Sequence, residues 1–229
     1  MATPKYHIET IFTPEQTNPD DAHSLLMRLI PRNSRVLELG CASGYLSGYM
    51  EQRLGCTVTG LEFDPAAVRI AATRMTQAQV VDLDQADALA VAASNAPYDG
   101  LLAAAILEHL KYPEAILQQA KALLKPGAWV IVSLPNIAHW SIRLKLLRGR
   151  FDYTDYGIMD RTHVHFYTVD TGRRLLEDQG FRVESVHIAG SAVQNLANRF
   201  ARATKRPLPA PIRPGLLAYE LIYVARWRG

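Results

Sequence analysis

Histidines and a nearby aspartate are the side chains of this sequence best suited to acid–base chemistry. His163 and His165 alternate with Val164, so an extended strand through them would point both imidazoles to one face. Asp160 lies just before them and could orient one of the two rings. Because histidine titrates near neutral pH, such a ring can take a proton from a nucleophile. We therefore expect this segment to supply a general base.

Other roles for these residues stay open. His109 follows a predicted strand at 100–104 and would lie at the lip of a crevice, either as a base or as an ordering residue. Arg161 could bind an anionic group such as a phosphate. A structural role, in which Asp160, Arg161 and the histidines hold one segment in place, accounts for the same pattern. The spacing is not a metal signature, so we assign no metal ligands.

A second feature is a glycine turn suited to binding a ligand through the backbone. The stretch Val36–Gly44 reads VLELGCASG, a short buried strand that Gly40 ends and a helix at 45–54 follows. This arrangement aims backbone N–H groups at a ligand, and glycines can take dihedrals that a side chain forbids. The spacing Glu38-x-Gly40-x-x-x-Gly44 lacks the G-x-G core of the dinucleotide fingerprint. A plain strand-to-helix turn is the alternative.

The end of the next predicted strand, 57–62, offers a partner for such a ligand. Glu62 closes that strand, and its carboxylate could accept hydrogen bonds from both ribose hydroxyls of an adenosine. Phe63 could lie against the base. A structural role for Glu62, as an exposed strand end or helix cap, is the alternative.

The third and fourth strands add further candidates. Asp82 and Leu83 end a strand near 79–83, and either Asp82 or Asp87 could accept from an adenine amine. We prefer Asp82 because it directly follows an apolar pair. The small Ala104 and Ala105 would let a cofactor lie close to the backbone.

Composition narrows the class of protein. The chain has 229 residues, 48% apolar and 21% charged, which is typical of a soluble domain with a substantial core. The net charge of +3 says little about nucleic acid. No apolar run approaches the length of a membrane span and the N-terminus lacks a signal-peptide pattern, so we expect a cytoplasmic protein. Two cysteines, Cys41 and Cys56, make no disulfide framework.

Basic residues gather in two places. The first is an arm at 190–215, and the second precedes Phe151. Either group could meet an anionic acceptor or a membrane surface, and a solvated face is the plainer interpretation. Their members are Arg199, Arg202, Lys205, Arg206 and Arg213 in the arm, and Arg143, Lys145, Arg148 and Arg150 in the second group.

The predicted elements that position these residues alternate between strands and helices. Apolar periodicity and turn residues predict helices at 20–30, 45–54, 64–75, 113–124 and 170–179, and strands at 36–39, 57–62, 79–83, 100–104, 129–134, 180–188 and 216–225. This alternation predicts an α/β fold with a parallel, doubly wound sheet. Residues 136–168 break the rhythm and are interpreted as an inserted cap. Residues 1–19 are interpreted as a flexible lead in a single domain that spans 1–229.

Taken together, these motifs resemble those of a known family. They are the E-x-G-x-x-x-G turn at 38–44, Glu62, and the sequences at 98–99, 107–110 and 124–127. From about residue 6 to 188 the chain resembles the class I S-adenosylmethionine (SAM) methyltransferases, including the ubiquinone-biosynthesis O-methyltransferases. It departs from the usual motif at Ala42, where glycine is commoner.

The resemblance implies a Rossmann-like, seven-stranded sheet with an antiparallel last strand, SAM as cofactor and S-adenosylhomocysteine as product. It also implies the residues that bind the cofactor. These are Glu38, Gly40, Cys41, Ala42, Ser43, Gly44, Glu62, Phe63, Asp82, Leu83, Ala104 and Ala105.

The segment 134–168 narrows the resemblance. Its motifs LPNIAHW, LRGRFDYT, GIMDRTH and FYT resemble methyltransferases of bacterial surface-polysaccharide and glycan synthesis, and more distantly the MetW family. This implies O-methylation of a sugar hydroxyl on a glycan precursor or glycolipid. A phenol or quinol acceptor is the alternative enzyme, and a non-catalytic, MetW-like regulatory partner is an alternative of another class. The missing G-x-G makes an NAD-binding protein a poor fit.

The same resemblance suggests roles within the cap. Quinone O-methyltransferases carry a Thr-His pair in this region, which favours His163 as the base over His109 and His165. Arg161, His139 and Tyr153 are candidates for acceptor binding. We expect a small-molecule or glycan acceptor and no nucleic-acid partner. Contact with a membrane surface, and the choice between monomer and homodimer, are left open.

Overall fold

The computed structural model describes residues 21–190 and 214–229. The helices are α1 (Ala22–Leu29), α2 (Tyr45–Leu54), α3 (Pro65–Ala71), η1 (Ala88–Asn95), η2 (Leu107–His109), α4 (Pro113–Lys121), α5 (Trp140–Leu147), α6 (Val169–Asp178) and α8 (Pro214–Leu217). The strands are β1 (Arg35–Leu39), β2 (Thr57–Glu62), β3 (Gln77–Val80), β4 (Tyr98–Ala104), β5 (Leu124–Pro135), β6 (Phe181–Ala189) and β7 (Glu220–Trp227).

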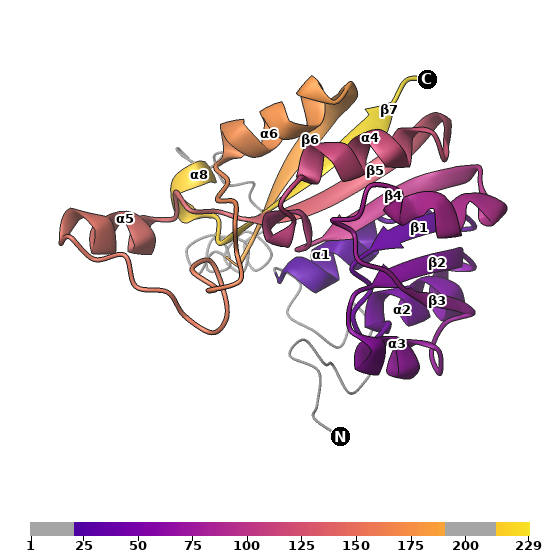
Figure 1. Cartoon of the computed structure of the whole chain (residues 1–229). Coiled ribbons are helices and arrows are strands. Elements are labelled where there is room, and N and C mark those ends of the chain that lie inside the picture. Colours follow the sequence, from indigo (N-terminus) through magenta and orange to yellow (C-terminus); the bar gives the residue numbers. More distant parts are fainter. Residues whose placement is uncertain (1–20, 191–213) are drawn as a thin grey trace, which may run out of the picture.

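The strands form one seven-stranded sheet in the order β3-β2-β1-β4-β5-β7-β6 (Figure 1). The neighbours from β3 to β5 pair in parallel, whereas β7 is antiparallel to both β5 and β6. The predicted sheet and its antiparallel last strand are therefore confirmed. Strand order reverses between β1 and β4, and ligands of open α/β sheets bind beyond the carboxyl ends of strands at such a point.

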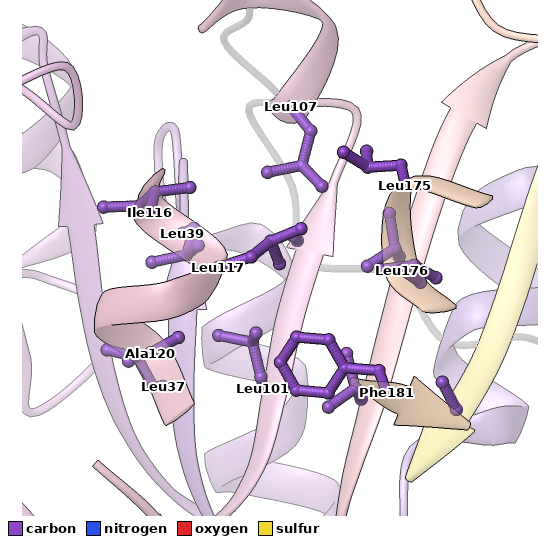
Figure 2. Packing of buried hydrophobic residues seen from close by; sticks show 14 of the residues in the cluster. Leu37, Leu39, Leu101, Leu107, Ile116, Leu117, Ala120, Leu175, Leu176 and Phe181 are labelled. Atoms are coloured by element: carbon purple, nitrogen blue, oxygen red, sulfur yellow. The ribbon is translucent and has the colours of Figure 1, made fainter. Parts of the chain in front are cut away.

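Helices cover both faces of the sheet because its strands are apolar on both sides. Leu37, Leu39 and Leu101 on one face pack with the buried residues of α4 and α6 (Figure 2). On the other face, Val36, Leu102 and the residues of α1 and α2 form a second core. Burial on both faces is what a parallel sheet requires, and it fixes the strand ends at one edge.

Local signals set several helix starts. The Asp64 carboxylate accepts from the N–H of Ala66 at 2.7 Å, with Pro65 at the first helical position, as predicted. Asp21 caps α1 in the same way. Thr168 and Thr171 cap α6 reciprocally, so the helix predicted at 170–179 begins one residue earlier.

Two element boundaries differ from the prediction. The third strand is Gln77–Val80 rather than 79–83, and β5 begins at Leu124, upstream of the predicted start at 129. Pro126 tolerates this because the pairing of β4 with β5 shifts register between Tyr98 and Gly100. In that irregular stretch a missing N–H breaks no regular ladder. The periodicity signal stopped at the proline, whereas the sheet continued.

Residues 136–168, interpreted as a cap, lie between β5 and α6, and α5 projects from the body of the sheet (Figure 1). Ile142, Ile158 and Met159 form a small core of this segment. The lead at 1–19 and nearly all of the basic arm, including its five cationic residues, lie outside the described residues. Within the described ranges, no helix has the length and apolarity needed to cross a membrane.

Gly100 is required by the packing of β4 against β5. An added Cβ would lie 1.9 Å from the indole of Trp129, a ring that is itself buried. We expect Gly100→Ala to lower the free energy of unfolding by about 1–3 kcal/mol, the usual cost of overpacking. Chemical denaturation measures it. The same change in a Trp129→Leu background, where the ring is absent, should cost less. Equal stability of Gly100→Ala and the wild type would contradict this packing.

Candidate active site

The turn after β1 is tied to the neighbouring strand through its backbone. The N–H groups of Gly40 and Cys41 both donate to the carbonyl of Leu61, at 2.8 and 3.0 Å. Gly40, Ala42 and Gly44 have positive φ of 69°, 47° and 74°. Gly44 is the N-cap residue of α2. The predicted glycine turn therefore exists at the helix N-terminus, where orphan N–H groups and the helix dipole are available to a ligand.

The two glycines have structural reasons as well as a ligand to accommodate. A Cβ on Gly40 would lie 2.8 Å from the Ile106 side chain, and one on Gly44 would lie 2.9 Å from the Cα of Ala71. Gly40 thus lets the turn after β1 meet the turn after β4. Gly44 lets α2 approach α3.

Ala42 adopts a conformation that favours glycine. In the left-handed region an alanine costs about 1 kcal/mol or more relative to a relaxed backbone. The Ala42 N–H donates to Glu62 Oε2 at 2.9 Å, and the Asp64 N–H donates to Oε1 at 3.0 Å. Glu62 therefore holds the turn that departs from the usual motif. A carboxylate has about four acceptor sites, so two remain with which it could accept from ribose hydroxyls.

Glu38 lies beneath this turn rather than in it. It is 2% exposed and accepts a hydrogen bond from the Ser47 hydroxyl of α2. Burial raises the pKa of Glu38 from 4.5 to about 7, and the negative charge of Glu62 adds to the effect. Cys41 and Ser43 are also buried.

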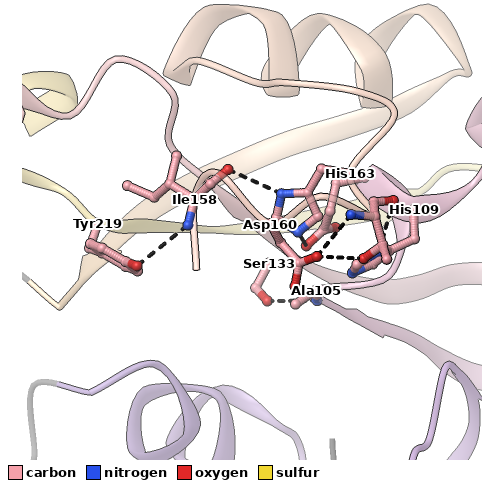
Figure 3. Close-up of polar contacts among 9 residues, drawn as sticks. Ala105, His109, Ser133, Ile158, Asp160, His163 and Tyr219 are labelled. Carbon is pink, nitrogen blue, oxygen red and sulfur yellow. Dashed lines mark hydrogen bonds and ion pairs between the residues drawn. The ribbon is translucent and has the colours of Figure 1, made fainter. Parts of the chain in front are cut away.

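A second polar cluster, Glu108, His109 and His163, lies at the end of β4 (Figure 3). One nitrogen from each ring and one oxygen of the carboxylate all lie within 4.8 Å of one another. Glu108 Oε1 is 3.9 Å from His163 Nε2, and the two imidazoles stack edge to face at 4.7 Å. We call these three residues the strand-end cluster. It joins the loop after β4 to the cap.

Hydrogen bonds determine which nitrogen of each ring carries the proton. Nδ1 of His163 faces the carbonyl of Ile158 at 3.1 Å, so Nδ1–H donates and Nε2 keeps the lone pair. Nδ1 of His109 faces the carbonyl and the hydroxyl oxygen of Thr162, at 3.3 and 3.1 Å. Because that hydroxyl donates to Asp160 at 2.7 Å, Nδ1 of His109 is also the donor. Each neutral ring then presents its basic nitrogen as Nε2.

The backbone holds the two halves of the cluster together. The N–H groups of Val164 and His165 donate to the carbonyl of Glu108 at 2.9 and 3.1 Å. Asp160, 1% exposed, accepts from both the N–H and the hydroxyl of Thr162. Asp160 therefore orients an imidazole, as expected, but does so through Thr162 and acts on His109.

His165 lies apart from this cluster, which corrects the expectation of a common face. Residues 163–166 form no strand. The ring of His165 contacts the carbonyl of Lys111 at 3.3 Å and packs near Tyr167. The period-2 argument was wrong here because turns and side-chain contacts, not a β-ladder, set the backbone of this segment.

The three acceptor-binding candidates occupy different parts of the cap. The guanidinium of Arg161 is mostly exposed and pairs with Asp155 at 2.8 Å. His139 is the N-cap of α5, with Nδ1 2.8 Å from the Ser141 hydroxyl. Tyr153 is half exposed and packs against Phe151 and Phe166. Their acceptor contacts stay predictions.

The remaining cofactor candidates follow the strand ends. Phe63 is 68% exposed beside Glu62, Leu83 is buried, and Ala105, with φ of 49°, donates its N–H to Ser133. The Asp82 carboxylate accepts from Gln85 and from the N–H of Asp84, which lowers its pKa. Asp82 and Asp87 both line an open hollow beside β3. The choice between them stays open.

Carboxylates gather at this edge of the sheet although the whole chain is weakly basic. The charge of Glu62 raises the pKa of Glu38, and those of Glu220 and Asp160 add to the burial that raises the pKa of Glu108 to about 8. Glu220, at the start of β7, also has a raised pKa through burial. This edge therefore favours a cation.

Sequence reasoning missed three members of the site. Glu108 stood in the quoted LEHL motif without a role, because a glutamate after a strand is usually exposed. Thr162 and Glu220 carried no signal, since each reaches the site through contacts distant in the chain. The Thr-His pair, used only to favour His163, was the one clue that could have suggested Thr162.

Glu38 should make folding pH-dependent in the protein without cofactor. Its pKa of about 7 lies above the ordinary 4.5, so the folded state holds the proton more tightly than the unfolded state. This contribution is complete below pH 4.5 and is lost as the pH rises through 7. Glu38→Gln should remove about 3 kcal/mol of that pH dependence. Denaturation at pH 5 and pH 8 tests it, and unchanged pH dependence would contradict the burial effect.

Comparison with known proteins follows this geometry. Residues 15–186 match a family model described as a methyltransferase domain. The ubiquinone biosynthesis O-methyltransferase of Paraburkholderia phytofirmans is 36% identical over 118 residues, 51% of this chain and 48% of the relative. The chain thus spans about half the length of that relative. The enzyme of the same name from Paracidovorax citrulli is 26% identical over 73% of this chain and 70% of its own length.

A solved structure has the same fold. The SAM-dependent methyltransferase from Archaeoglobus fulgidus superposes with a TM-score of 0.61, covering 93% of this chain and 94% of the other. At 14% identity this likeness shows the fold alone. The family model and the sheet together identify the chain: it belongs to the methyltransferase domain family, as a class I SAM-dependent methyltransferase related to the ubiquinone biosynthesis O-methyltransferases.

Proposed function

We propose that this protein transfers the methyl group of SAM to a hydroxyl oxygen of an acceptor. The observation that carries the proposal is the pairing, at one edge of the sheet, of a glycine turn held by Glu62 with an imidazole whose Nε2 bears a lone pair. Gly40 and Ile106 join the two loops. The turn is suited to the donor, and the strand-end cluster to the acceptor.

The carboxylates at this edge support a positively charged donor. SAM carries a sulfonium and an ammonium group against one carboxylate, so its net charge is positive. Glu38 and Glu62 lie at the turn, and Glu108, Asp160 and Glu220 lie beyond β4 and at the start of β7. Loss of the methyl group removes the sulfonium charge, so the same field favours SAM over its product S-adenosylhomocysteine.

The transfer itself needs alignment and one proton acceptor. The acceptor oxygen attacks the methyl carbon in line with the sulfur, an O–C bond forms, and the C–S electron pair returns to sulfur. The hydroxyl proton moves to Nε2 of His163, while its Nδ1–H stays on the Ile158 carbonyl. The imidazolium that forms is stabilised by Glu108, 3.9 Å away.

Two acceptor classes have separate support. The motifs at 134–168 favour a sugar hydroxyl on a glycan precursor or glycolipid, and exposed rings of the cap, Tyr153 and Phe151, could stack on a sugar face. The names of the relatives favour a phenol or quinol. Incubation with methyl-labelled SAM and either nucleotide sugars or dihydroxybenzoates would separate them. SAM binding without transfer to any acceptor would favour the MetW-like regulator instead.

Glu62 should contribute directly to SAM affinity. Glu62→Ala removes acceptors for the ribose and releases the Ala42 N–H, so SAM binding should weaken by about 1.5–3 kcal/mol. Isothermal titration calorimetry measures this, with circular dichroism to show folding. Glu184→Ala is a matched control, because Glu184 is a partly exposed carboxylate on β6 paired with Arg182. Unchanged SAM affinity in a folded Glu62→Ala variant would remove Glu62 from the site.

His163 should matter to turnover more than to SAM binding. As the base, its loss in His163→Ala should lower kcat by roughly 100- to 10,000-fold with SAM affinity near that of the wild type. His109→Ala and His165→Ala should have smaller effects. His187, on β6 beside Ser185, provides a control outside the site. If His109→Ala abolishes turnover and His163→Ala does not, the base lies at the strand end instead.

A further inference from the structure

The strand-end cluster has the composition of a metal site. Two imidazoles and one carboxylate, from Glu108, His109 and His163, have ligand atoms within 4.8 Å of one another. Two histidines with one carboxylate form a common set for divalent transition metals that keep open coordination positions. The sequence spacing concealed this, because 54 residues separate His109 from His163 and the fold alone brings them together.

The side-chain hydrogen bonds prepare both rings as ligands. A metal-binding histidine usually donates its other N–H to a carbonyl or carboxylate, which fixes the tautomer and the orientation of the ring. His163 does so to the Ile158 carbonyl. Nδ1 of His109 is held by Thr162, which Asp160 holds in turn. These are the outer partners that a metal site requires, and they leave Nε2 of each ring as the coordinating nitrogen.

Glu108 supplies an independent observation. It is 1% exposed, and within the described part of the chain its Oε2 has no hydrogen-bond partner. A buried carboxylate oxygen without a partner is costly unless a proton or a cation compensates it. Its nearest printed charge partner is His163 Nε2 at 3.9 Å, too long for a hydrogen bond.

We infer that Glu108, His109 and His163 bind one divalent transition-metal ion of the zinc or manganese type. Coordination at about 2.0–2.2 Å would draw the ligand atoms roughly an ångström closer together. Three protein ligands leave positions for water or for the acceptor oxygen. Asp160 and Glu220, whose charges reach Glu108, add to the attraction for a cation.

The role of the ion rests on the proposed function. A metal-bound hydroxyl loses its proton more readily than a free one, so the ion would activate the acceptor oxygen beside the methyl donor. In that state Nε2 of His163 is a ligand, and the proton leaves to solvent. A neutral sugar hydroxyl would need this help more than a phenol does.

Metal binding can be tested without any acceptor. We expect the wild-type protein, stripped with a chelator, to bind Zn²⁺ or Mn²⁺ one to one in calorimetry, to gain thermal stability, and to bind Co²⁺ with a visible spectrum. Glu108→Gln, which keeps the size of the side chain, and His163→Ala should weaken the affinity at least about 100-fold. His165→Ala is the matched control for metal affinity, since that ring lies outside the cluster.

The outcomes are distinct. Absence of one-to-one binding by the wild type at micromolar metal would overturn the site, as would equal affinity in folded Glu108→Gln. Metal binding without methyl transfer to any acceptor would support the site and refute the proposed function. Full transfer by chelated, metal-free protein would refute the role of the ion and leave the methyltransferase activity standing.

Discussion

The contact between the turn after β1 and the turn after β4 is the constraint on which this site depends. Gly40 meets the Ile106 side chain so closely that even a Cβ would be displaced. Because β1 and β4 are neighbours in parallel register, their carboxyl ends emerge together, and this contact sets their separation. The donor turn and the strand-end cluster are therefore parts of one rigid edge, which suits a reaction that consists mainly of alignment.

The same edge shows how the protein places charge. Its bulk charge is slightly positive, yet carboxylates from β1, β2, the β4 loop, the cap and β7 converge on the strand ends. Burying so many acids is unfavourable by itself, and the raised pKa values of Glu38 and Glu108 express that cost. Such strain is common at functional sites, where a cationic ligand relieves it. Here a sulfonium donor, and a metal ion beside it, would both have that effect.

The cap connects this charge arrangement to acceptor choice. Only its inner portion, 158–165, touches the strand ends, through the Glu108 carbonyl and the two imidazoles. Its outer portion carries α5 and exposed aromatic residues such as Trp140 and Tyr153. This division separates groups that perform the transfer from groups that contact the rest of the acceptor. Variation of the outer part could then change the acceptor while the chemistry is kept.

The sequence alone determined the sheet, the glycine turn and the placement of Glu62, because these depend on local patterns: apolar runs, positive-φ glycines and an acid at a strand end. Asp64 with Pro65 set a helix start for the same reason. It could not place Glu108 in a buried cluster with His163, separate His165 from it, or carry β5 through Pro126. Those features arise from packing between segments far apart in the chain, where neighbouring strands and a folded cap, not local preference, determine which side chains meet.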